Sequence, residues 1–382
     1  MGLSDVLARY AARRAHVLIV EIPGAWIVRA RLERQLIERG WRLGLTPADA
    51  DVLAVCGTPG PELTGVVDRL WDQMPGPRVR ADLDETTEID EALNVVASQL
   101  ADTENHRKDA AQRANEPQAA SDESAMDHGD MDHGDMEMAP DGIPLAEGED
   151  DRDGLEMDVL HLRLGPVLPH WPAGLVLSCT VSGDVISRAE ASMVDDAGSG
   201  APTVSHTPSP AWRADNIARF LALAGWEDAA TLARRIRDAQ LTSHASPQTN
   251  ASAQTNASAQ IDASLGRLRR QVTHSRLLRR SAQGLRPLTP QKLEAHGLPQ
   301  HLSGDTWDRL LNMLDQAVDT GGAVDAADEG AADEGTDETR VQGPSPSAIA
   351  AAVVGLDLAA ARLVIASLNM PPSLVPMAAP HG

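Results

Sequence analysis

Two short apolar segments near the N-terminus constrain the fold of this chain more than any other feature. His16 to Ile22 (HVLIVEI) and Val52 to Val55 (VLAV) have the length and composition of strands buried on both faces. Apolar residues then recur at helical spacing in 27–39 and in 62–73. Alternation of strand and helix with short turns predicts a parallel sheet covered by helices. We therefore expect an α/β domain over residues 1–101.

The rest of the chain alternates between helical patterns and polar low-complexity segments. Residues 102–154 are rich in acid and poor in apolar residues, which predicts a disordered linker. A second domain is expected over 155–372, followed by a short tail at 373–382. Two repeats, QTNASAQTNASAQ and AADEGAADEGTDE, interrupt this domain. Because neither can bury a core, we expect disordered inserts at about 242–262 and 319–344.

The second domain is predicted to be α+β and mainly helical. Its helical patterns lie at 212–224, 229–239, 265–282, 304–318 and 345–368. Ser303 and Ser347 are expected to be the N-caps of the last two. Aromatic residues make up only 2% of the chain, so both cores must be built from Val, Leu, Ile and Ala.

Charge and hydropathy limit the class of protein. The chain has 56 Asp and Glu against 33 Lys and Arg, which gives a formal net charge of −23. A general nucleic-acid-binding protein needs clustered positive charge, so we expect no nucleic-acid partner. The N-terminus lacks a signal-peptide pattern, and no run of about 18 apolar residues occurs. These features predict a cytoplasmic protein.

A tract rich in Met, His and Asp is the strongest candidate for a metal site. It reads MDHGDMDHGDMEM, and its candidate ligands are Met126, His128, Met131, His133, Met136 and Met138. Thioether and imidazole groups favour copper(I), and imidazole with carboxylate suits copper(II), nickel or zinc. Binding of copper or nickel would be weak, because a flexible tract must be ordered when it binds. The alternative is an acidic linker without a metal role.

One segment is basic in this acidic chain. Between Leu265 and Lys292 there are eight basic residues and no acidic ones: Arg267, Arg269, Arg270, Arg276, Arg279, Arg280, Arg286 and Lys292. This segment could face an acidic partner, lipid headgroups or the chain's own acidic loops. We favour a solvated helix face that is paired within the chain.

The N-terminal domain contains a motif series that resembles a known family. The stretch from Ala48 to Arg78, ADADVLAVCGTPGPELTGVVDRLWDQMPGPR, has a strand, a Gly-Thr turn, a helix and then DQMP followed by Pro-Arg. It is similar to the small, cluster-bearing subunit shared by respiratory complex I and nickel–iron hydrogenases. The resemblance implies a flavodoxin-like fold for this domain.

The second domain resembles the partner of that subunit, the large quinone-site subunit of complex I, which is related to hydrogenase large subunits. Three stretches carry the resemblance, and they occur in the family's order: 160–190 for the opening β-hairpin, 303–316 for a Gly-Asp-x-x-Asp-Arg helix, and 350–366 for the terminal helix. Together the matches cover about half of the chain. The protein is therefore similar to a fusion of two subunits that normally face each other.

The departures from these families concern the cofactor ligands. The small subunit holds its cluster on four cysteines, but this chain has only Cys56 and Cys179, and the stretch 21–26 has none. Because iron–sulfur clusters are held by thiolates, we expect no cluster and no other resident cofactor. The Cys-x-x-Cys pairs that hold nickel are missing, and Tyr10, the only Tyr, lies away from the quinone-site position. His170, in a Pro-rich turn, is the one candidate counterpart of the quinone-site His.

The resemblance implies a catalytically degenerate accessory or structural subunit of a complex I-like or hydrogenase-like redox complex, not an enzyme on its own. Its partners would be protein subunits of that complex, and it would lie in the cytoplasm or at the inner face of the plasma membrane. One alternative is an active quinone oxidoreductase (NADH dehydrogenase-like) subunit that relies on a partner's cluster. Another is a copper- or nickel-handling protein that uses the tract containing His128 and His133.

Overall fold

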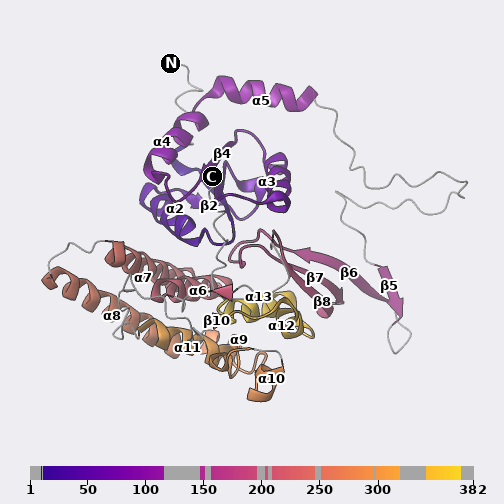
Figure 1. The fold of residues 1–382 in the computed structure, drawn as a ribbon. Helices are drawn as coiled ribbons and strands as arrows, with labels where there is room; N and C mark the ends of the chain where they lie inside the picture. The colour runs from indigo at the N-terminus through magenta and orange to yellow at the C-terminus, as the bar shows by residue number, and fades with distance from the viewer. Residues whose placement is uncertain are drawn as a thin grey trace, which may run out of the picture.

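The computed structural model describes residues 10, 12–115, 147–150, 156–195, 203–204, 209–245, 251–295, 298–318 and 341–370. An N-terminal α/β unit lies on one side of the molecule, and layers of helices lie on the other (Figure 1). A sheet of antiparallel strands lies beside the place where the two meet. The molecule thus combines a parallel α/β unit with a mainly helical unit, as the periodicity predicts.

The N-terminal unit is built on a parallel sheet with the strand order β2-β1-β3-β4. Its strands are β1 (His16–Glu21), β2 (Arg42–Leu43), β3 (Val52–Cys56) and β4 (Val79–Leu83). Its helices are α2 (Trp26–Arg39), α3 (Pro61–Gln73), α4 (Ile89–Leu100) and α5 (Thr103–Asn115). Side chains alternate across β1 and β3, so one face of the sheet packs on α2 and α4 and the other on α3.

The predicted strands and helices of this unit are confirmed, but two strands were not predicted. β2 has two residues, and β4 places Arg80 and Asp82 between its buried apolar residues. Both pair with only one other strand and form the edges of the sheet. Short or charged edge strands carry little of the apolar signal that marks a central strand.

The second unit contains an antiparallel sheet and a helical layer. The sheet has the order β5-β6-β7-β8, and a separate pair joins β9 to β10. The strands are β5 (Glu147–Asp150), β6 (Glu156–Leu164), β7 (Leu175–Ser182), β8 (Val185–Met193), β9 (Thr203–Val204) and β10 (Val341–Gln342). The helices are α6 (Pro210–Leu223), α7 (Glu227–Ala245), α8 (Ala251–His274), α9 (Arg276–Ala282), α10 (Pro290–Ala295), α11 (Thr306–Val318), α12 (Pro346–Val353) and α13 (Leu358–Ser367).

Helices occur in two segments for which the composition predicts disorder. Residues 103–115 of the expected linker form α5, and most of the expected insert at 242–262 belongs to α7 and α8. The QTNAS repeat has no Gly or Pro, and Ala and Gln are good helix formers. Apolar residues from Ile261 onward then anchor α8 in the core of the helical layer. Within the 319–344 insert, residues 319–340 lie outside the described residues.

The helix caps also differ from those predicted. Asp305, not Ser303, caps α11, because its side chain accepts a hydrogen bond from the Asp308 backbone N–H at 2.9 Å. The helix expected at 345–368 is divided at Gly355, which has φ 84°, a conformation that favours glycine. Ser345, instead of Ser347, caps α12. Asp357 caps α13.

The two units are packed against each other through several kinds of contact. Val176 and Val194 of the antiparallel sheet region belong to the same buried cluster as the α3 face of the parallel sheet. Asp195 accepts hydrogen bonds from the backbone N–H groups of Glu62 (2.9 Å) and Leu63 (3.0 Å) at the start of α3. A residue of the second unit therefore caps a helix of the first. No helix in the described ranges is both long enough and apolar enough to cross a membrane.

Candidate functional site

The surface between the two units carries a cluster of charged side chains. β1 ends at Glu21, and α2 presents Arg29 and Glu33 one turn apart. From the other side, α6 presents Asp215 and Arg219 one turn apart, and α7 presents Arg237. We call these six residues the interface network.

The interface network is closely hydrogen-bonded. Arg29 contacts Glu21, Glu33 and Asp215, each at 2.6 Å. Arg219 contacts Glu21 at 2.6 Å and Asp215 at 3.0 Å. Arg237 contacts both Glu33 and Asp215 at 2.7 Å. Each carboxylate therefore contacts at least two arginines. Three of these ion pairs join β1 or α2 to α6 or α7.

All six side chains are buried, with exposed fractions between 0% and 11%. Burial by itself would raise the pKa of Glu33, but the charges of Arg29 and Arg237 outweigh it and lower the pKa to about 2. Burial likewise opposes ionisation of Asp215, yet its three arginines hold its pKa well below the ordinary value. Both carboxylates are ionised at neutral pH. Removing one partner of a buried ion pair destabilises the folded state by about 3–5 kcal/mol, because the other charge is left buried without a partner.

Aromatic packing adds to the same surface. The rings of Trp26 on α2 and Trp212 on α6 meet edge to face, with centroids 5.2 Å apart and planes at 71°. The guanidinium of Arg219 lies 5.5 Å from the centre of the Trp212 ring. Each contact of this kind stabilises the folded state by about 0.5–1.5 kcal/mol, in addition to the effect of burying apolar surface. The interface thus combines apolar, aromatic and ionic contacts.

His170 lies next to the interface network, in the loop between β6 and β7. Its backbone has φ 60°, an uncommon conformation for a residue other than glycine. Burial, and then the positive charge of Arg234, lower the pKa of His170 to about 4, so its imidazole is neutral at pH 7. Among the described residues, no hydrogen bond to its ring occurs. A neutral imidazole can offer either a donor or an acceptor to a ligand.

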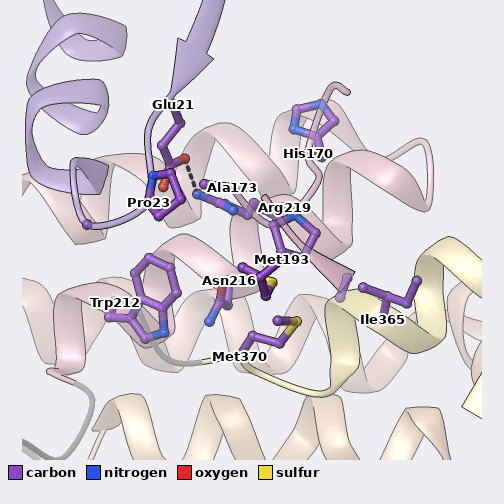
Figure 2. A pocket seen from close by; sticks show the side chains of 13 residues that line it. Glu21, Pro23, His170, Ala173, Met193, Trp212, Asn216, Arg219, Ile365 and Met370 are labelled. Carbon is purple, nitrogen blue, oxygen red and sulfur yellow. Dashed lines mark hydrogen bonds and ion pairs between the residues drawn. The ribbon is translucent and has the colours of Figure 1, made fainter. Parts of the chain in front are cut away.

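Two cavities meet at this histidine. The smaller, of about 40 Å³, is drawn in Figure 2; it lies above Met193 and Met370, and Glu21, His170 and Arg219 also line it. The larger has a volume of about 350 Å³ and lies between the two units. It shares Glu21, His170 and Arg219 with the smaller cavity.

The lining of the larger cavity is mixed. Apolar side chains come from both units, namely Leu43, Leu45, Leu70, Val167 and Leu168. Charged side chains come from the interface network and from Arg234, which pairs with Glu227 at 2.5 Å. A volume of about 350 Å³ lies within the range of about 300–1,000 Å³ that is typical of small-molecule sites. The lining suits a ligand with an apolar body and a polar group.

The remaining candidate residues do not join this site. Cys56 is fully buried in the sheet core and Cys179 is buried in another core cluster, and burial raises the pKa of both thiols. These thiols cannot supply the set of cysteines that an iron–sulfur cluster needs, so the residues present do not fit that cofactor. Tyr10 is 61% exposed. The candidate metal tract with its six predicted ligands, 126–138, lies outside the described residues.

The sequence predicts His170 as a candidate residue but not the interface network. The periodicity of 27–39 identifies the apolar residues of this helix and assigns no role to Arg29 or Glu33. They in fact share a stripe with Leu32 and Leu36, at spacings of three and four residues. Asp215 shares a similar stripe with Trp212. A charged residue that falls on the apolar stripe of a helix indicates a buried polar site, and both helices carry this pattern.

Comparison of the sequence with protein-family models and with curated proteins gives no match.

Proposed function

We propose that this chain is a single-chain relative of the small and large subunits of complex I and nickel–iron hydrogenases, and that it acts as a cluster-free accessory subunit of such a redox complex. The motif series and its order suggest the relationship. The strand order β2-β1-β3-β4 supports a flavodoxin-like first unit, because flavodoxin-like sheets follow the order 2-1-3-4-5.

The interface network is the observation that carries this proposal. In the related complexes the two units belong to separate chains that face each other, and here a buried ionic surface joins them. A chain that lacks the thiolates but keeps a buried ionic contact between its units is suited to a structural task. The proposed location is the cytoplasmic side of the membrane, in association with the other subunits.

Two measurements in native cells test this role. The tagged full-length chain should co-purify in mild detergent with respiratory-type or hydrogenase-type subunits, identified by mass spectrometry. Deleting its gene should reduce the amount of assembled complex on native gels. Normal assembly without the chain, together with purification free of such subunits, would contradict the proposal.

The larger cavity favours a second candidate function, quinone binding in an oxidoreductase subunit whose electrons come from a partner's cluster. His170 is the proposed polar contact for a quinone carbonyl, and the leucine-rich lining would hold its ring and chain. A short-chain ubiquinone should bind the full-length protein, and His170→Ala should weaken binding at least about tenfold, as for the loss of a hydrogen bond at a desolvated site. His161→Ala is the matched control, because His161 lies on β6 outside the cavity.

The same substitution separates the two functions. A gene carrying His170→Ala should restore both complex assembly and quinone reduction in the deletion strain if the chain is only structural. If the chain acts on quinone, this gene should restore assembly but not quinone reduction.

A further inference from the structure

The outer face of α8 and α9 carries an unusual concentration of positive charge. Arg267, Arg270, Arg276, Arg279 and Arg280 are all exposed, and we call them, with Leu277, the basic face. The sequence favours a solvated helix face that is paired within the chain for this segment. Of the eight basic residues between Leu265 and Lys292, only Arg269, beside the basic face, has a carboxylate partner within the described part of the chain. This partner is Asp315, at 2.7 Å. The five arginines of the basic face have none there.

The helical core fixes the orientation of this face. Leu265, Leu268 and Val272 on α8 and Leu278 on α9 are buried against the neighbouring helices. The arginines between them must therefore point away from the core. α8 packs against α7 and α11, and in Figure 1 α7 lies between the N-terminal unit and α8. The basic face thus lies on the side of the molecule away from the interface network.

Leu277 is the feature that distinguishes this face from an ordinary solvated helix. It is 82% exposed, more than any other large apolar side chain in the described residues. It lies between Arg276 and the pair Arg279 and Arg280, at the start of a short helix. An exposed apolar side chain next to Arg276 and Arg280 matches the boundary between lipid headgroups and acyl chains, where the guanidinium groups can bind phosphates.

We propose that the basic face docks this protein onto an anionic phospholipid surface, with Leu277 inserted among the headgroups. The chain's net charge of −23 would otherwise repel it from such a surface. Charges beyond about 8 Å are screened at physiological salt, so a local basic patch can bind while the rest of the molecule stays acidic. An acidic protein partner is the alternative occupant, and the experiment below separates it from a lipid surface. This inference rests on the surface alone and is independent of the proposed subunit role.

Flotation of the full-length protein with lipid vesicles tests the inference. We expect binding to phosphatidylcholine vesicles that contain about a third phosphatidylglycerol, no binding to phosphatidylcholine alone, and release at high salt. Each arginine near an anionic surface contributes about a fivefold increase in the binding constant, so Arg276→Gln with Arg280→Gln should weaken binding about 25-fold. Leu277→Ser should weaken it about tenfold.

The control is the double substitution Arg13→Gln with Arg14→Gln, which changes the net charge equally at two exposed positions of the N-terminal unit. It should bind vesicles like the wild type. Circular dichroism and melting temperature should be unchanged in all variants, because every altered side chain is exposed. Equal binding to both vesicle types, or equal loss in the control, would overturn the proposal. Binding to polyglutamate without binding to anionic vesicles would also overturn it and would indicate an acidic protein partner.

Discussion

Replacing Glu33 by Gln tests the interface network most directly. The substitution keeps the size of the side chain and removes the charge that pairs with Arg29 and Arg237. The pKa of Glu33 is lowered from the ordinary 4.5 to about 2. Each unit of pKa difference between the folded and unfolded states corresponds to about 1.4 kcal/mol, so Glu33 contributes about 3 kcal/mol to the free energy of unfolding at neutral pH. The free energy of unfolding of the variant should therefore be about 3 kcal/mol lower than that of the wild type at pH 7.

The pH dependence gives a second, independent expectation. A carboxylate with a lowered pKa stabilises the folded state above its unfolded-state pKa, and this stabilisation is lost as pH falls towards the folded-state pKa. The wild type should thus lose the contribution of Glu33 between about pH 4.5 and pH 2, whereas Glu33→Gln has none to lose. By this linkage the gap between the two proteins should shrink by about 1.4 kcal/mol at about pH 3.5.

Urea unfolding followed by tryptophan fluorescence measures both quantities, because Trp26 and Trp212 lie at the interface. Glu38→Gln is the matched control, since Glu38 pairs with Arg34 at the same helical spacing on the same helix. Those two side chains are 52% and 47% exposed, and an exposed pair contributes only about 0.3–0.5 kcal/mol. The reasoning is wrong if both substitutions have equal effects, or if the gap for Glu33→Gln does not shrink in acid.

Three further predictions concern contacts within and between the units. Asp195→Ala removes the cap of α3 and should lower the free energy of unfolding by about 1 kcal/mol in urea titrations. An unchanged free energy of unfolding would mean that the cap is not formed. Gly174→Ala should lower the free energy of unfolding more than Gly183→Ala in the same assay. Both glycines have positive φ, but only at Gly174 would a new Cβ lie 2.8 Å from Pro23. Equal effects of the two substitutions would contradict close docking of the units. Cys56 and Cys179 should react with a thiol reagent only after unfolding, and rapid modification of the native protein would show that a thiol is accessible.

Local patterns were sufficient to predict much of the fold. β1 and β3 lie in the centre of the sheet, so their apolar runs stand out, and α2 and α3 carry clear apolar stripes. The beginning of α8 was missed because a repeat without large apolar residues resembles a loop by composition. Among the described side chains of α8, the buried core residues begin at Ile261. Composition alone does not separate a polar helix anchored at one end from a disordered insert.

The sequence by itself determined the class of each unit, the acidic character of the chain and the lack of enough thiolates for a cluster. Only the tertiary structure decided which charges are buried. Arg29 with Glu33 and Arg34 with Glu38 follow the same four-residue spacing on α2. One pair is buried and the other exposed because α6 and α7 approach a single side of α2. The four-residue spacing alone does not distinguish a structural ion pair from a solvated one, because burial depends on partners far away in sequence.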